Sequence, residues 1–139
     1  MINLDEIIDK LVKKFKTNDP FIIADGLNIL IRYANFEDGT RGLYYRKLRR
    51  RFIVIHNELD DHWKRVVCAH ELAHDRLHPD LSRFWLDDYS FFNAGKYEKQ
   101  ANTFALKLLT HSEQQQPEEP IERFLQRCGI PQELHSFYD

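Results

Sequence analysis

The sequence predicts an α+β fold, a small single domain in which a short three-stranded sheet lies beside several helices. Two observations support this prediction: three short apolar runs have the length of strands, and two longer stretches repeat apolar residues at helical spacing. The third observation is the length, because 139 residues suffice for one domain with a hydrophobic core and are too few for two ordinary domains.

Each predicted element rests on a local pattern of apolar residues and on the residues that begin or end a helix or strand. Amphipathic helices show apolar residues every three or four positions. Proline is frequent in the first turn of a helix, and glycine is frequent where a helix ends. Strands appear as short apolar runs bounded by polar or glycine residues. The predicted elements are, in order, a helix over 2–16, a short helix over 20–26, a strand over 28–33, a hairpin with strands over 42–46 and 52–56, a helix over 62–78, a helix over 96–110 and a short helix over 121–128.

The composition is that of a globular protein without a disulfide framework. Hydrophobic residues make up 42% and charged residues 30% of the chain. The net charge of -2 gives no broad electrostatic reason to bind nucleic acid. No apolar run approaches the roughly 18 residues of a membrane span, and the charged N-terminus does not resemble a signal peptide. Two isolated cysteines, Cys68 and Cys128, indicate a reducing compartment, so we expect a cytoplasmic protein.

The most informative motif lies in the predicted helix over 62–78 and reads His-Glu-x-x-His. His70 and His74 are one helical turn apart, so they share a face at a separation of about 6 Å and can hold one metal ion. Glu71 lies one step round the helix, where it can take a proton from a metal-bound water, as in zinc peptidases. The alternative is a pair of surface histidines on an amphipathic helix, which the apolar residues around the motif disfavour.

Two neighbours of the motif are poor ligands for geometric reasons. His78 lies eight residues beyond His70, which is about 12 Å along a continuous helix and too far to share an ion. Cys68 lies two residues before His70 and points away from the histidine pair, so we expect a packed thiol. A catalytic zinc site usually has three protein ligands and a water, so a third ligand is expected elsewhere in the chain.

Carboxylates after the motif helix are the candidates for that third ligand. Asp87 and Asp88 lie in an aromatic-rich loop that is expected over 80–95. Glu98 is the better candidate because it lies in the first turn of the next helix, among core-facing neighbours, with Asn102 one turn on. A buried carboxylate needs a partner, and a metal ion is a good one. From spacing alone, a plain surface glutamate is an equal alternative.

Other features of the chain have simpler interpretations. The hairpin turn is basic, which suits a solvated turn better than a phosphate site. By analogy with many metallopeptidases, the strand over 52–56 lies beside the cleft, where an extended peptide adds to its edge. No oxyanion donor is identifiable, although three residues are considered for this role: His56, Tyr89 and His111. The basic residues of the turn are Lys47, Arg49, Arg50 and Arg51.

Three blocks of sequence together resemble the ImmA/IrrE family of small metallopeptidases. They have the order and similar spacing of the blocks of that family, and the resemblance covers about residues 1–112. We therefore expect a metallopeptidase domain over 1–112 and a C-terminal helical extension over 113–139, packed on the same domain. The blocks are T-N-D-P-F-I-I-A-D-G-L over 17–27, H-E-L-A-H-D-R-L-H over 70–78 and E-K-Q-A-N-T-F-A-L-K-L-L over 98–109.

The resemblance implies a role for each matching residue. His70 and His74 match the zinc histidines of the family, Glu71 its catalytic glutamate, and Glu98 its carboxylate ligand. The implied fold is zincin-like, with a short sheet beside the metal helices. Many members are encoded by phages and mobile elements, and some cleave a helix-turn-helix repressor. This chain departs from the family in having no fused DNA-binding domain and a long aromatic loop between the ligands.

Together these observations predict a zinc-dependent endopeptidase that cleaves an intracellular protein, with a repressor as the substrate implied by the resemblance. Zn²⁺ is the expected cofactor and Mn²⁺ the alternative. The competing interpretation is a metal-containing antirepressor or regulatory protein that binds its partner without cutting it. Such a binder would not need Glu71, so the enzyme is favoured. A purely structural zinc domain is less favoured, because structural sites usually have four protein ligands and prefer cysteine.

Overall fold

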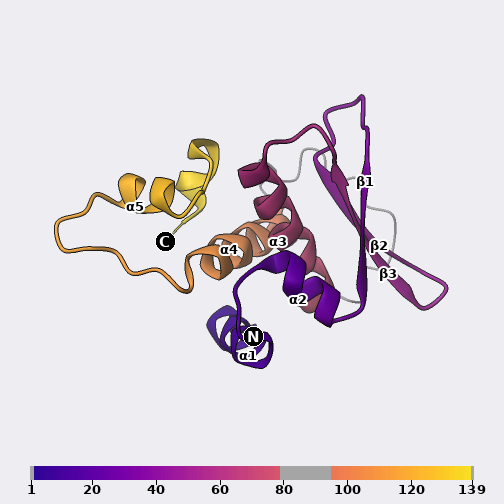
Figure 1. Ribbon diagram of the computed structural model, residues 1–139, viewed down its shortest axis with the longest axis horizontal. Helices are drawn as coiled ribbons and strands as arrows, with labels where there is room; N and C mark the ends of the chain where they lie inside the picture. The colour runs from indigo at the N-terminus through magenta and orange to yellow at the C-terminus, as the bar shows by residue number, and fades with distance from the viewer. Residues whose placement is uncertain (1, 79–94, 139) are drawn as a thin grey trace.

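A computed structural model describes residues 2–78 and 95–138 of the chain (Figure 1). It confirms the predicted α+β fold and each predicted helix and strand, with ends that differ by a few residues. The loop predicted over 80–95 lies almost wholly outside the described residues. The elements are α1 (Leu4–Phe15), α2 (Pro20–Gly26), β1 (Ile29–Ala34), β2 (Gly42–Lys47), β3 (Arg50–His56), α3 (Asp61–Leu77), α4 (Lys96–Thr110), α5 (Ile121–Arg127) and the 3₁₀ helix η2 (Gln132–Phe137).

Side-chain caps define where the first helices begin. The Asn3 side chain accepts a hydrogen bond from the backbone N–H of Glu6 at the start of α1, at 3.1 Å. The Asp19 side chain accepts one from the backbone N–H of Phe21 at the start of α2, at 2.8 Å. Such caps satisfy backbone donors that have no partner within the first turn of a helix. Both helices pack onto the rest of the domain, α1 against α4 and α2 against α3 and β1.

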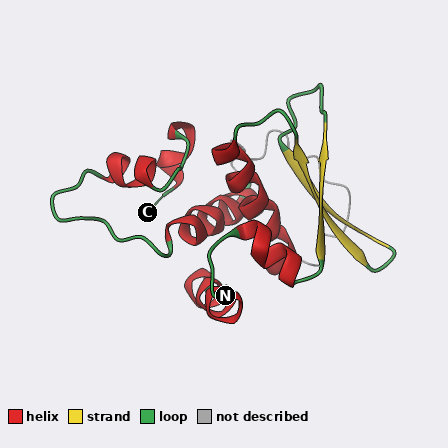
Figure 2. Ribbon diagram, viewed as in Figure 1, coloured by secondary structure: helices red, strands yellow, loops and turns green. Residues whose placement is uncertain are grey.

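The sheet has the strand order β1-β3-β2, with β1 parallel and β2 antiparallel to β3 (Figure 2). The hairpin between β2 and β3 turns through Leu48 and Arg49, both with left-handed φ values of 51° and 69°. Because β3 pairs on both sides, the expectation that a peptide adds to the edge of the strand over 52–56 is wrong. Within the described part of the chain, the outer edges of the sheet belong to β1 and β2.

Helix α3 lies between the sheet and α4, as Figure 1 shows, and it contacts α2, β2, β3 and α4. A helix covered on two sides needs apolar residues on both, and nearly all of its residues from Val66 to Leu77 are buried. Polar side chains in this stretch are therefore held inside the protein. The fully buried large side chains around α3 include Ile53, Ile55, Leu72, Phe104 and Leu108.

The C-terminal segment folds as α5 and η2. Gly129, which follows α5, has a φ of 80°, a left-handed conformation that favours glycine. Helix η2 contacts both α4 and α5, and its Leu134 is buried together with Phe124 and Leu125 of α5. Among the described helices, none has the length and apolar character required to cross a bilayer.

Strand β2 lies close to α3 at Gly42. A Cβ atom built at this position would overlap Cγ1 of Val67 and lie 3.1 Å from the backbone oxygen of Val54. We therefore expect Gly42→Ala to destabilise the protein by about 1–3 kcal/mol, the usual cost of overpacking a core. Denaturant unfolding measures the loss, and the double variant with Val67→Ala is the control because it removes the overlapping methyl group. Losses that simply add in the double variant would contradict this explanation.

Candidate metal centre

Helices α3 and α4 bring two imidazoles and one carboxylate together. Oε1 of Glu98 lies 3.1 Å from Nε2 of His70 and 3.3 Å from Nε2 of His74. One ligand atom from each of the three residues lies within 4.8 Å of the others. A tetrahedral zinc ion with bonds of about 2.0–2.1 Å holds neighbouring N and O ligand atoms about 3.3–3.4 Å apart. The spacing of the carboxylate from both rings therefore fits a single ion of this size.

The opposite edges of the two imidazoles are held by hydrogen bonds. Nδ1 of His70 lies 2.9 Å from Oδ1 of Asn102 on α4. Nδ1 of His74 lies 3.1 Å from Nδ1 of His78, whose Nε2 lies 2.8 Å from Oε1 of Gln100 on α4. Such contacts on the far side of a ligand fix the orientation of its ring. The Nε2 atoms of both histidines are thereby directed toward Glu98.

The supporting roles of Asn102 and His78 are not predicted by the sequence patterns. Their spacing marks Asn102 only as a neighbour of Glu98 and His78 only as an unsuitable ligand. Both residues carried a signal, because each lies one helical turn after a candidate ligand and therefore on the same face of its helix. The partner that each side chain meets could not be read from that spacing, since it depends on how α3 and α4 pack.

The charge state of Glu98 suits a ligand. Burial by itself raises the pKa of this carboxyl group, but hydrogen bonds from His70 and His74 and their charges outweigh burial. The net result is a pKa far below the ordinary value for glutamate, so the group is ionised at neutral pH. Burial lowers the pKa of His78, which keeps that ring neutral. Metal ligands must be deprotonated, and the carboxylate of Glu98 meets that condition.

Glu71 lies on α3 next to His70 and is fully buried. Its Oε2 atom is 3.5 Å from the position that a Cβ atom would occupy at Gly42, so the carboxylate lies at the boundary between α3 and the start of β2. A Cβ atom at Gly42 would make ordinary van der Waals contact with this carboxylate. The backbone of β2 therefore passes directly beside the glutamate of the motif.

Asp75 is a further buried carboxylate that sequence reasoning missed. Its side chain is 0% exposed and accepts hydrogen bonds from the hydroxyl of Tyr44 at 2.5 Å and from Arg51 at 3.0 Å. Arg76 binds the same carboxylate at 2.7 Å, and Arg51 also donates to the backbone oxygen of Leu27. Arg51, expected in a solvated turn, instead joins α3 to the sheet and to the end of α2.

The remaining candidates lie outside this arrangement or outside the described residues. Nδ1 of His56 accepts a hydrogen bond from the backbone N–H of Phe36. His111 pairs with Asp9 at the C-terminal end of α4, whereas Glu98 lies in the first turn of that helix. Cys68 is buried in the core, and its pKa is raised by burial, so the prediction of a packed thiol is confirmed. The candidates outside the described residues are Asp87, Asp88 and Tyr89.

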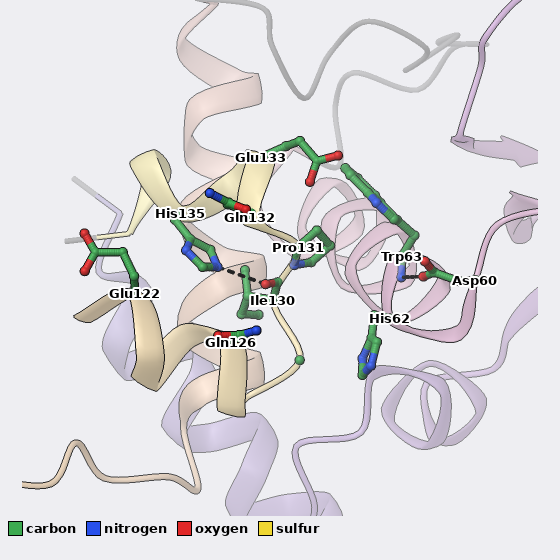
Figure 3. Close-up of a pocket in the computed structure, with 11 residues that line it drawn as sticks. Asp60, His62, Trp63, Glu122, Gln126, Ile130, Pro131, Gln132, Glu133 and His135 are labelled. Carbon is green, nitrogen blue, oxygen red and sulfur yellow. Dashed lines mark hydrogen bonds between the residues drawn. The ribbon is translucent and has the colours of Figure 1, made fainter. Parts of the chain in front are cut away.

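A cavity of about 590 Å³ lies elsewhere, between the first turn of α3 and the α5–η2 segment (Figure 3). In this view His62 and Trp63 face Ile130 and Pro131 across the opening. The residues of the metal centre do not line it. The cavity is therefore a separate feature of the fold.

Comparisons with known proteins place the chain in a family. The family model described as an IrrE N-terminal-like domain, Peptidase_M78, matches residues 24–126, which include the sheet, α3 and α4. The chain is also 32% identical over 136 residues to "Uncharacterized immunity region protein 2" of Bacillus phage phi105, a match that covers 95% of this chain and 86% of that protein. Both findings agree with the family indicated by the sequence blocks, and the chain belongs to the Peptidase_M78 family of IrrE N-terminal-like domains.

Proposed function

We propose that this protein is a metal-dependent endopeptidase, with Zn²⁺ as the metal and Mn²⁺ as the alternative. The observation that carries the proposal is the convergence of His70, His74 and Glu98 at separations of 3.1 and 3.3 Å from carboxylate to ring. Two imidazoles and one carboxylate form a common ligand set of catalytic zinc, which keeps one position for water. Membership of a peptidase family supports the same reading.

In the proposed mechanism each residue has one task. His70, His74 and Glu98 would hold the ion, which would supply Lewis acidity toward a water molecule and the scissile carbonyl. Glu71 accepts a proton from the attacking water and later delivers it to the amine of the leaving fragment. The burial of Glu71 keeps bulk water away from this proton transfer.

We propose an intracellular protein as the substrate, specifically a DNA-binding repressor of a phage or mobile element. The relative from Bacillus phage phi105 is named for an immunity region, which supports a role in such a regulatory system. Cleavage of a repressor would relieve repression irreversibly, whereas a binder without activity would relieve it only while bound. This difference separates the endopeptidase from the competing antirepressor function.

The experiment that tests the proposal combines capture and mass measurement. The Glu71→Gln variant serves as bait for partner proteins, because it should bind a substrate without cutting it. Each captured protein is then incubated with zinc-loaded wild-type protein, with and without a chelator. We expect two fragments whose masses sum to the partner plus one water, and no fragments with chelator. If the partner stays intact and remains bound, the result would support the antirepressor function instead.

A further inference from the structure

The tip of the β2–β3 hairpin extends beyond the rest of the sheet. Strand β1 pairs with β3 only from Arg51 onward, so residues 47–50 form a ribbon without a third strand. Figure 1 shows this ribbon projecting away from the helices at the right of the view. Residues 46–50 are all exposed, and Leu48 at the tip is 85% exposed. The tip therefore presents a large apolar side chain to solvent.

The backbone of the turn is unfavourable for the residues that occupy it. Leu48 and Arg49 have left-handed φ values of 51° and 69°. A two-residue hairpin turn of this geometry favours asparagine or glycine, because a larger side chain crowds the backbone there. A turn that is only solvated, the simpler interpretation of this basic segment, gives no reason to place a leucine at such a position. An exception of this kind to local preferences points to a role other than stability.

Cations surround Leu48. Lys47 and Arg50 lie directly opposite each other in the ribbon, and like charges in this arrangement destabilise paired strands. Arg49 is the second residue of the turn. Within the described part of the chain, no carboxylate forms an ion pair with any of these three cations, because Asp75 binds arginines closer to α3. The tip is therefore a positive surface around an apolar side chain, which an anionic partner would neutralise.

We propose that this hairpin tip binds double-stranded DNA. The major groove of DNA admits a two-stranded β-ribbon, and several DNA-binding proteins use strands in this way. In this arrangement Lys47, Arg49 and Arg50 contact phosphate oxygens that border the groove. Leu48 packs against base edges inside it, where the methyl groups of thymine offer an apolar contact.

The small size of the tip favours DNA over other anionic partners. A stable protein interface buries about 1,000 Å² or more, which four residues do not supply. Stable attachment to a membrane needs more apolar surface than one leucine. DNA is bound through individual phosphate contacts, each of which adds affinity by releasing counterions. The net charge of -2 opposes this contact little at physiological salt, because charges more than about 8 Å apart are largely screened.

The proposed function would give this contact a use. A repressor bound to its operator is held on DNA, so a peptidase that also binds and slides along DNA would meet it more often. This consequence rests on the proposed function. The DNA contact itself involves neither the metal centre nor cleavage, and it can be measured without any protein substrate.

The first measurement is the fluorescence anisotropy of a labelled duplex of mixed sequence, about two helical turns long, titrated with the full-length protein. For three phosphate contacts, affinity should fall about 40-fold between about 50 and 200 mM salt. The Lys47→Gln/Arg50→Gln variant should keep one contact and lose only about 3–4-fold over the same range. Lys13→Gln/Lys14→Gln is the matched control, because it changes the net charge equally at exposed positions of α1 and should behave as the wild type.

The second measurement separates binding from stability in Leu48→Asn. Asparagine tolerates the left-handed conformation, so the thermal unfolding midpoint should rise by about 2–8 °C. The charge of the tip is unchanged, but DNA affinity should fall about tenfold because the apolar contact is lost. A residue that served only the hairpin would not show these opposite effects.

The absence of duplex binding by the wild type at about 50 mM salt would overturn the proposal, as would the same salt dependence in both double variants. Binding to phosphatidylserine vesicles through the tip, without duplex binding, would also overturn it and assign the tip to a membrane surface. Full DNA affinity in Leu48→Asn would overturn the contact assigned to Leu48. Duplex binding by a protein that cleaves no partner would defeat the proposed function alone, and cleavage without duplex binding would defeat the DNA contact alone.

Discussion

Replacement of Glu71 by glutamine is expected to lower the rate of peptide-bond cleavage by about 10²–10⁴-fold, the usual contribution of a general base. Glutamine has nearly the same shape but cannot accept a proton from water at neutral pH. The ligand atoms of His70, His74 and Glu98 are not altered, so zinc stoichiometry should stay the same. Initial rates on a captured substrate, measured with equal zinc content, give the comparison.

Stability separates loss of chemistry from loss of fold in this variant. Glu71 is fully buried, and glutamine has nearly the same volume, so the unfolding free energy of Glu71→Gln should stay within about 1.5 kcal/mol of the wild-type value. Glu58→Gln is the control, because Glu58 is an exposed residue in the turn before α3. Metal-dependent turnover that survives in Glu71→Gln would remove the proposed role of this residue, whatever the stability result.

Replacement of Asp75 by alanine is expected to destabilise the fold by about 3–5 kcal/mol, the range found when one partner of a buried ion pair is removed. The variant would leave the guanidinium groups of Arg51 and Arg76 without their carboxylate and the hydroxyl of Tyr44 without its acceptor. The midpoint of denaturant unfolding measures the loss. Asp5→Ala is the control, because its pair with Lys107 is solvent-exposed and should contribute less than about 1 kcal/mol.

Acid should remove the same stabilisation from the wild type. Burial alone raises the pKa of Asp75, but hydrogen bonds from Tyr44 and Arg76 and the charges of Arg76 and Arg51 lower it below its usual value. Because the folded pKa is the lower one, the contribution is complete above the unfolded value of about 3.9 and is lost as pH falls through the folded value. The stability difference between wild type and Asp75→Asn should therefore shrink below about pH 4. A difference that stays constant with pH would contradict this account.

The parts of the fold that were predictable are those set by local patterns. The helical turn between His70 and His74 fixes their common face regardless of the rest of the protein. The hairpin of β2 and β3 follows from two apolar runs around a short turn. The central position of β3 was not predictable in this way, because the pairing of β1 with it depends on contacts between segments separated by more than twenty residues.

The same distinction applies to the candidate site. Glu98 was a candidate from its place in a helix, but spacing alone could not exclude a surface position. The burial of Asp75 was not predictable from helical periodicity, because it is a polar residue. Its partners Tyr44 and Arg51 lie on two strands, and the register of these strands decides which side chains face α3. Residues that act through such long-range packing are recognisable only once the elements are placed.

The candidate metal centre is divided between α3 and α4, and Glu98 lies 28 positions after His70 and 24 after His74. During synthesis, a nascent chain therefore exposes the two histidines from the ribosome well before it exposes the carboxylate and the amides that complete the group. A chain interrupted before α4 would hold at most an imidazole pair, and an ion bound there would lack its acidic partner. The three candidate ligands are therefore all present only after α4 has been synthesised, when the sheet and α3 have already emerged.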